Sequence, residues 1–279
     1  MLPTIRQALL QCGLVPVDAQ VLLAHVVGCN RTWLVAHAGD PLTRVHADAF
    51  FALAKRRRDG EPVAYLTGER EFWGLSLTVT PDVLIPRPET ETLVELALTW
   101  LPVDASVRVL DLGTGSGAIA LAIASERPGA TVLAIDRSAN VVAIARGNAQ
   151  KLGLHNVRFA VTDWYAAVAS AHFDMIVSNP PYVAERDPHL EEGDLRHEPA
   201  SALASGADGL AALRVITAGA PEHLAPGGLL LVEHGHDQAS AVRDLFTAAG
   251  FDEITMRRDL AGISRVVGGR IRRRNLTSG

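Results

Sequence analysis

In the first sixty residues of the chain, hydrophobic residues recur with the spacing of an α-helix. One such pattern runs to Val27, with Asp18 as its expected N-cap and Gly28 as its stop. A second pattern runs from about Thr43 to Gly60. Because each helix would carry one apolar face, we expect the helices to pack together as a small bundle.

A short stretch with a two-residue period follows the helices. Between Tyr65 and Thr80, the run from Glu71 to Val79 alternates in polarity and contains a turn residue, Gly74. This pattern predicts a β-hairpin that links two domains. We therefore expect four parts: a helical domain at 1–62, a hairpin linker at 63–82, a second domain at 83–269 and a basic tail at 270–279.

The second domain repeats a strand-then-helix pattern. Buried strands are expected at 107–112, 131–135, 157–161, 173–178 and 228–232. Helices are expected at 118–126, 140–152, 210–224 and 238–249, and two last strands near 251–256 and 263–267. Alternation of this kind predicts an α/β fold with a mostly parallel, doubly wound sheet, whose ligands bind beyond the carboxyl ends of the strands.

Composition narrows the class of protein. The 279 residues are 48% hydrophobic and 20% charged, which is typical of a folded globular enzyme. The formal net charge of -5 argues against tight electrostatic binding to duplex nucleic acid, so we expect no direct nucleic-acid partner.

No run approaches the roughly 18 apolar residues that cross a bilayer and no signal peptide is evident, so we expect no membrane association. Two cysteines, Cys12 and Cys29, form neither a disulfide framework nor a metal-ligand pattern, and we expect a cytoplasmic monomer without a bound metal.

A glycine-rich loop ends the first strand of the expected sheet. Glycines there let the chain turn sharply and bring backbone N–H groups close to a ligand. The pattern of Gly113, Gly115 and Ala118 also fits a dinucleotide-binding loop, and Asp136 at the end of the next strand suits either cofactor. An NAD-dependent enzyme therefore stays open at this point. The candidate cofactor-binding residues of the loop are Gly113, Thr114, Gly115, Ser116 and Gly117.

Three further features favour S-adenosylmethionine over a dinucleotide. Asp111 lies two residues before the first glycine, where a carboxylate can order the loop or accept from an ammonium group. Gly117 adds a third closely spaced glycine, a run that is frequent in methyltransferases. After the third strand, Asp163 and Trp164 offer an acid and a flat ring to an adenine. We therefore expect S-adenosylmethionine as cofactor, with S-adenosylhomocysteine as product.

A proline-rich turn follows the fourth strand and consists of Asn179, Pro180, Pro181 and Tyr182. Prolines fix their φ angles and donate no N–H, so the turn is stiff and its carbonyl groups stay available as acceptors. The Asn179 side-chain oxygen and the Pro180 carbonyl can accept both hydrogens of one planar NH2 group, with Tyr182 against its face. Such a grip would orient the nitrogen toward a methyl donor. We take Asn179, Pro180 and Tyr182 as catalytic candidates and all four residues as substrate-binding; adenine, cytosine and glutamine stay open as the NH2 donor.

Several motifs, taken in order, make the chain similar to one known family. They are Glu61–Gly68, Glu71–Trp73, Leu84–Glu91, Asp111–Gly117, Asp163–Trp164, Ser178–Tyr182, Asp187–Leu190 and Arg196–Leu203. Over nearly its whole length the chain resembles the bacterial release factor glutamine methyltransferases, the PrmC/HemK family. One departure is His197, where relatives are expected to carry Phe.

The resemblance implies a class I S-adenosylmethionine-dependent methyltransferase fold, Rossmann-like, with a small N-terminal helical domain. It implies methylation of the side-chain amide nitrogen of glutamine in the Gly-Gly-Gln motif of class-1 peptide-chain release factors. It also implies that Ile85–Glu89 closes over the cofactor and that the helical domain docks the release factor. By matching, the cofactor contacts are Gly113–Gly117, Asp136, Trp164 and Asn179, and the glutamine amide contacts are Asn179–Tyr182.

Two other functions stay open. An amino-methyltransferase acting on adenine in DNA or RNA would need a basic track for the nucleic-acid backbone, which the acidic balance disfavours. A non-catalytic module that keeps the fold only for docking would be expected to have lost Asp136 or Asn179, and both are present.

Overall fold

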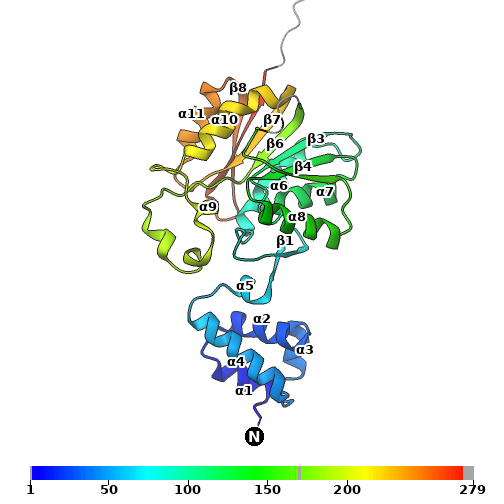
Figure 1. The fold of residues 1–279 in the computed structure, drawn as a ribbon, viewed down its shortest axis with the longest axis vertical. Helices are drawn as coiled ribbons and strands as arrows, with labels where there is room; N and C mark the ends of the chain where they lie inside the picture. The colour runs from blue at the N-terminus through cyan, green and yellow to red at the C-terminus, as the bar shows by residue number, and fades with distance from the viewer. Residues whose placement is uncertain (1, 167, 169–170, 273–279) are drawn as a thin grey trace, which may run out of the picture. The chain divides into compact units, whose positions relative to one another are not determined.

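The computed structural model describes residues 2–166, 168 and 171–272 and divides the chain into two compact units. A helical unit comprises Met1–Glu69 together with Glu191–His197. A sheet unit comprises Arg70–Leu190 and Glu198–Gly279. Figure 1 shows the N-terminal helices in blue and the sheet with its covering helices in cyan to red.

Side-chain caps fix where several helices of the helical unit begin. Thr4, Asn30 and Thr43 each accept a hydrogen bond from a backbone N–H of the turn that follows. The helix expected after Asp18 begins earlier, at Pro16, so the predicted N-cap is wrong. Proline suits the first helical position because its φ is fixed and an N–H there would lack a helical partner. The helices in the described part of this unit are α1 (Ile5–Gln11), α2 (Pro16–Val27), α3 (Arg31–Ala36), α4 (Arg44–Arg58) and α5 (Val63–Thr67).

A shared apolar core confirms that these helices pack as a bundle. Leu22 and Leu23 from α2, Leu34 from α3 and Phe50 from α4 are all buried in it. The apolar faces predicted for α2 and α4 therefore pack within one core, as their helical spacing requires.

The predicted hairpin is confirmed, although the first residues of the predicted linker, Val63–Thr67, form helix α5 instead. At the hairpin turn, Trp73 and Gly74 have φ angles of 52° and 69°, both in the left-handed region. Asn148 accepts a hydrogen bond from the Thr78 N–H at 2.8 Å and donates one to the Thr78 carbonyl at 3.0 Å, which fixes the second strand. The two strands are β1 (Glu69–Phe72) and β2 (Leu75–Thr78).

The sheet unit holds the mostly parallel sheet that the strand-then-helix pattern predicts. Its strand order is β5-β4-β3-β6-β7-β9-β8, with β9 antiparallel to both β7 and β8 and the other pairs parallel. Strand β9 reaches Ile271, so Arg270 and Ile271 belong to the sheet, although the sequence placed them in the basic tail; residues 273–279 lie outside the described range. The strands are β3 (Arg108–Leu112), β4 (Thr131–Asp136), β5 (Val157–Val161), β6 (Phe173–Ser178), β7 (Leu224–Glu233), β8 (Phe251–Arg258) and β9 (Ser264–Ile271).

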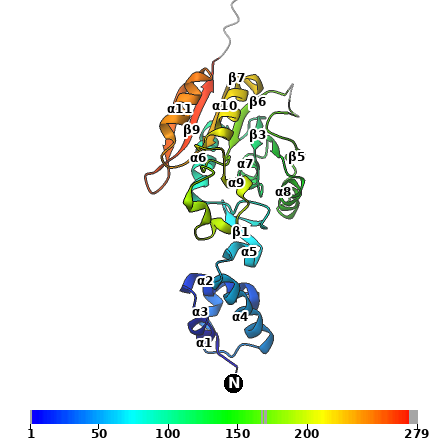
Figure 2. The same ribbon diagram turned by 60° about the vertical axis from the view of Figure 1, so that its left-hand side comes forward.

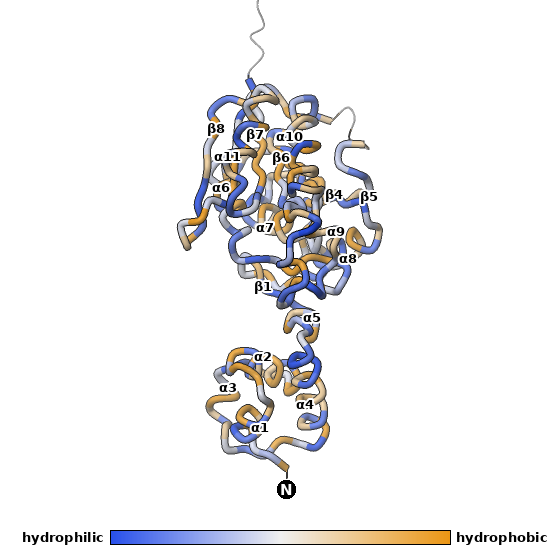
Figure 3. The backbone as a smooth tube through the Cα atoms, turned by 90° about the vertical axis from the view of Figure 1, so that its left-hand side faces the viewer, coloured by the Kyte–Doolittle hydropathy of each residue, from blue (hydrophilic) through white to orange (hydrophobic). Residues whose placement is uncertain are grey.

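Helices cover both faces of this sheet (Figures 1 and 2). Helices α6, α7 and α8 pack on one face, and α10 and α11 on the other. Consecutive residues of β3 divide between them: Val109 joins the first core and Leu110 the second. Figure 3 shows β7 and α7 as largely hydrophobic, as buried central elements require. The helices are α6 (Glu91–Trp100), which the sequence reading missed, α7 (Ala118–Glu126), α8 (Ala139–Lys151), α9 (Ala200–Leu203), α10 (Ala211–His223) and α11 (Ala239–Ala248).

Candidate active site

A cavity of about 290 Å³ opens in the sheet unit beyond the carboxyl ends of β3, β4, β5 and β6. Its volume is in the range of small-molecule sites, and its place is the one expected for ligands of a doubly wound sheet. The expected site residues that line it are Gly113, Thr114, Gly115, Ser116, Asp136, Trp164, Asn179 and Pro181. Gly117, Pro180 and Tyr182 are outside the described lining.

The glycine loop is held in a conformation that favours glycine. Gly113, Gly115 and Gly117 have φ angles of 71°, 56° and 89°. A Cβ at Gly117 would lie 3.0 Å from the Leu121 Cδ1 atom, so this glycine also permits close packing against α7. The Thr114 N–H donates to the carbonyl of Ile135 at 2.8 Å and ties the loop to the end of β4. The loop therefore presents its backbone along one wall of the cavity.

Asp111 lies beneath the loop and is fully buried. Its Oδ2 atom accepts a hydrogen bond from the Thr114 hydroxyl at 2.6 Å, while Oδ1 has no hydrogen-bond partner among the described residues. Burial raises the pKa of Asp111 to about 7. Of the two roles that the sequence left open for this acid, the contact with Thr114 supports ordering of the loop.

Asp136 ends β4 and faces the cavity. Its two oxygens accept hydrogen bonds from the backbone N–H groups of Gly115 at 3.3 Å and Ser138 at 3.1 Å. Burial raises the pKa of this carboxyl group as well. An acid at this strand end, exposed to the cavity and oriented by backbone N–H groups, is suited to accept from ribose hydroxyls.

Trp164 lines the cavity beside the glycine loop. Its backbone φ of 43° is in the left-handed region, which is uncommon for a bulky residue. The ring approaches Gly113 closely enough that a Cβ there would lie 3.8 Å from it. Thr162 and Asp163 line the cavity next to it. A flat ring and an acid thus lie together at the cavity, where the sequence placed an adenine.

Asn179 follows β6, and its side-chain amide lies at the cavity. Its Nδ2 group donates to the Thr90 hydroxyl at 3.0 Å, which fixes the orientation of the amide. Its Oδ1 atom is buried and has no hydrogen-bond partner among the described residues. Buried acceptors are normally paired, so an unpaired one beside a cavity points to a ligand that donates an N–H or O–H. Next to it, the buried Ser178 hydroxyl donates to the Leu112 carbonyl at 2.7 Å and holds the ends of β6 and β3 together.

The rest of the turn is fixed by residues far away in the sequence. The Tyr182 hydroxyl donates to Glu233 Oε1 at 3.1 Å, and the Tyr182 carbonyl accepts from Gln238 Nε2 at 2.9 Å. A Cβ at Gly209 would lie only 2.3 Å from that carbonyl oxygen. Glu233 is buried, and burial raises its pKa to about 7. Sequence reasoning missed these supporting roles, because no local pattern connects them to the turn.

A second wall of the cavity comes from segments that the sequence reading only partly recognised. The expected closing segment Ile85–Glu89 contributes Pro86 to the lining, and Thr90 follows it. This wall has one part before α6 and one part at α9. The family resemblance carried by 84–91 and 196–203 was the sequence signal for these two parts. The remaining residues of this wall are Pro81, Asp82, Val83, Leu84, Pro199, Ser201 and Ala202.

Family models match both units of the chain. Residues 90–206 match the model described as methyltransferase small domain, which, with the parallel sheet, defines a Rossmann-like methyltransferase. Residues 2–68 match the model described as PrmC N-terminal domain.

Curated relatives specify the family further. The release factor glutamine methyltransferase of Burkholderia pseudomallei (strain K96243) is 55% identical over 260 residues, which cover 91% of each chain. That of Bordetella pertussis (strain Tohama I) is 54% identical over 266 residues, 95% of this chain and 98% of the relative. The chain belongs to the release factor glutamine methyltransferase family.

A more distant solved structure shares the fold alone. The T. thermophilus 16S rRNA N2 G1207 methyltransferase, in complex with AdoMet and guanosine, is 20% identical with a TM-score of 0.54. The match covers 73% of this chain and 50% of that one.

Within 2–166, 168 and 171–272, no group of three or more His, Cys, Asp or Glu side chains is arranged to hold a metal ion. Over the same ranges, no helix has the length and apolar character needed to span a membrane.

Proposed function

We propose that this chain transfers a methyl group from S-adenosylmethionine to the side-chain amide nitrogen of glutamine in the Gly-Gly-Gln motif of class-1 peptide-chain release factors. The substrate rests on the relatives, which are named for release factor glutamine methylation. The chemistry rests on the cavity and on Asn179.

The cavity residues fit S-adenosylmethionine, which would supply an electrophilic methyl group when bound. The Asp136 carboxylate is suited to the ribose hydroxyls, and the loop backbone at 113–117 to the polar end of the molecule. Trp164 is suited to stack on the adenine. S-adenosylhomocysteine would be the product.

The observation that carries the chemistry is the buried Oδ1 of Asn179, which has no hydrogen-bond partner in the described part of the chain. Because Nδ2 is already bonded to Thr90, the side chain presents an acceptor to the ligand. An amide nitrogen is a poor nucleophile, since its lone pair is delocalised into the carbonyl. Acceptance of its N–H hydrogens by Asn179 and the Pro180 carbonyl would stabilise the positive charge that develops on the nitrogen as its C–N bond forms and the S–CH3 bond breaks. The methylated amide would then lose one of these protons to solvent. Pro181, which lines the cavity, and Tyr182 would complete the substrate grip.

We assign the docking of the release factor to the helical domain at 1–62, and the reaction to the cytoplasm, where release factors act. We expect the enzyme to work as a monomer and without direct contact to nucleic acid.

Transfer of labelled methyl from S-adenosylmethionine to a purified class-1 release factor tests this function. The same factor with its Gly-Gly-Gln glutamine replaced, and duplex DNA, serve as controls. We expect label only in the unaltered factor. Label in DNA, or equal label in the substituted factor, would contradict the proposal.

A further inference from the structure

The chain between the Asn179 turn and α9 belongs to both units in succession. Residues Glu191–His197, here called the anchored segment, are part of the helical unit. The next residue, Glu198, belongs to the sheet unit again. One peptide bond therefore joins the anchored segment of the helical unit to Glu198 of the sheet unit.

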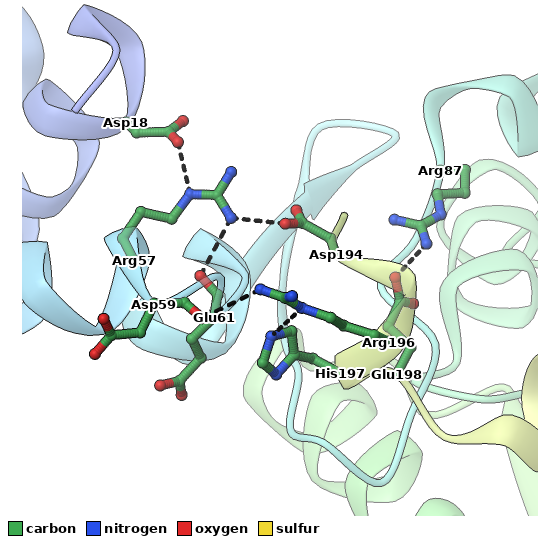
Figure 4. A network of polar contacts seen from close by, with 9 residues as sticks. All are labelled: Asp18, Arg57, Asp59, Glu61, Arg87, Asp194, Arg196, His197 and Glu198. Atoms are coloured by element: carbon green, nitrogen blue, oxygen red, sulfur yellow. Dashed lines mark hydrogen bonds and ion pairs between the residues drawn. The ribbon is translucent and has the colours of Figure 1, made fainter. Parts of the chain in front are cut away.

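Arg57 on α4 is the centre of the contacts that hold the anchored segment (Figure 4). Its Nη1 atom donates to Asp194 Oδ1 at 2.6 Å and to the Glu61 carbonyl at 3.2 Å, while Nε donates to Asp18 Oδ2 at 2.7 Å. The Arg57 side chain is only 22% exposed, so these charge-assisted bonds are partly shielded from solvent. In the same unit, Arg196 Nη2 donates to the Asp59 carbonyl at 3.1 Å. The anchored segment is therefore held from both α4 and its C-terminal turn.

Glu198 is held just as firmly in the sheet unit. Its side chain is fully covered, at 0% exposure, which is costly for a carboxylate unless it is paired. It has two partners: the Ile85 N–H donates to Oε2 at 3.0 Å, and Arg87 Nη2 forms an ion pair with Oε1. Figure 4 shows the carboxylate turned toward Arg87.

These contacts place Glu198 between two parts of the cavity wall. Leu84 and Pro86, on either side of Ile85, line the cavity, and so does Pro199, which follows Glu198. The Glu198 carboxylate itself is outside the described lining, so its contacts with the cavity run through these neighbouring residues.

We propose that Glu198 is a positioning residue that joins two segments of the second wall of the cofactor pocket, 84–86 and 199–202, and that the helical unit helps to fix it through the anchored segment. The identity of the ligand rests on the proposed function. The physical basis is preorganisation: a wall that is already fixed loses less conformational entropy when the ligand binds. Loosening of the anchored segment would then lower the affinity of the pocket for its ligand, although the segment does not line the pocket. Such an effect is a coupling between two sites.

The first test is Glu198→Gln, with Glu95→Gln as a matched control on the exposed surface of the sheet unit. Gln keeps an acceptor for the Ile85 N–H but loses the charge that pairs with Arg87. We expect the Kd of S-adenosylhomocysteine, measured by titration calorimetry, to rise about tenfold, which corresponds to one weakened charge-assisted bond. The KM for release factor should stay within about twofold, because the walls act on the cofactor. An unchanged Kd in a folded variant overturns the role of Glu198.

The second test is Asp194→Asn, with Asp48→Asn as control, since Asp48 is paired on the same helix as Arg57 but lies 75% exposed. We expect Asp194→Asn to raise the Kd of S-adenosylhomocysteine about threefold, although Asp194 is outside the cavity lining. The double variant with Glu198→Gln should bind no more weakly than Glu198→Gln alone. Additive losses, or no loss from Asp194→Asn, overturn the link to the helical unit. If the wild-type enzyme binds no S-adenosylhomocysteine, the proposed function fails instead.

Discussion

The glycine loop and the Asn179 turn lie at neighbouring strand ends, yet they are built in different ways. Four consecutive residues of the loop, Gly113–Ser116, line the cavity, and the conformation that they need is encoded by their own glycines. The turn contributes only Asn179 and Pro181 to the lining. Its Tyr182 is directed to Glu233, a residue fifty-one positions away.

One element is common to both regions: a fully buried carboxyl group lies beneath each. Asp111 lies under the loop and Glu233 under the turn, and burial raises the pKa of each to about 7. Each has one oxygen without a hydrogen-bond partner in the described chain. The difference therefore lies in what sets the conformation: the loop's own glycines permit its left-handed φ angles, whereas the turn depends on side chains far away in the sequence. Changes remote from the turn should damage catalysis, and changes in the loop region should damage cofactor binding.

The largest expected effect follows from Gly209→Ala, which tests the long-range support of the turn. Its Cβ would lie 2.3 Å from the Tyr182 carbonyl oxygen, so the turn must move. A shift of this kind misplaces the reacting groups, and we expect methyl transfer to fall by about 100-fold or more. Gly153→Ala is the control, because Gly153 also has a positive φ of 68° but its Cβ would have no described atom within 4 Å. Equal, mild losses in both variants would show that the turn does not depend on Gly209.

A smaller effect is expected in the loop region from Asp136→Ala. Loss of this carboxylate should weaken S-adenosylmethionine binding by about 1.5–3 kcal/mol, the range for hydrogen bonds to charged groups. Titration calorimetry gives the dissociation constant. An unchanged value would remove Asp136 from the cofactor site, and binding of NADH in its place would overturn the methyltransferase chemistry.

The smallest expected effect is a pH-dependent change in stability from Glu233→Gln. Because the folded pKa is raised to about 7 from an ordinary 4.5, the folded chain holds a proton that the unfolded chain releases between these values. Stability from this group is therefore lost as pH rises from about 4.5 to 7. Gln does not titrate, so it lacks this loss. The free energy of unfolding of the variant, relative to that of the wild type, should therefore rise by roughly 2 kcal/mol across this window, somewhat less than the full pKa shift implies. Urea unfolding at pH 5, 6, 7 and 8 measures the gap; a gap that does not widen with pH contradicts a raised pKa at Glu233.

The sequence predicts what is encoded locally. Strands such as β5 and β6 appear with the predicted bounds, because short apolar runs between turn signals define buried strands. The glycine loop and Asp136 were found from spacing alone, and both line the cavity. Helix α6 was not predicted, although Leu93, Val94 and Ala97 have helical spacing.

Long-range features could not be predicted in this way. The partner of Tyr182 lies in β7, and the partners of Glu198 lie more than one hundred residues earlier in the chain. No periodicity or turn signal marks such pairs, since they depend on how the elements pack. The wrong N-cap prediction at Asp18 has the same cause. Its carboxylate accepts a hydrogen bond from Arg57 on another helix, and no local pattern marks this pairing.

Single-turnover methyl transfer by Asn179→Ala, at saturating S-adenosylmethionine, tests the central claim most directly. If Asn179 Oδ1 accepts from the glutamine amide in the transition state, the variant should lose about 10²–10³-fold in rate. Its cofactor affinity should fall by far less, and Asn179→Asp, which keeps an acceptor, should lie between Ala and the native enzyme or match Ala. A native single-turnover rate in Asn179→Ala would contradict the assigned chemistry of the turn.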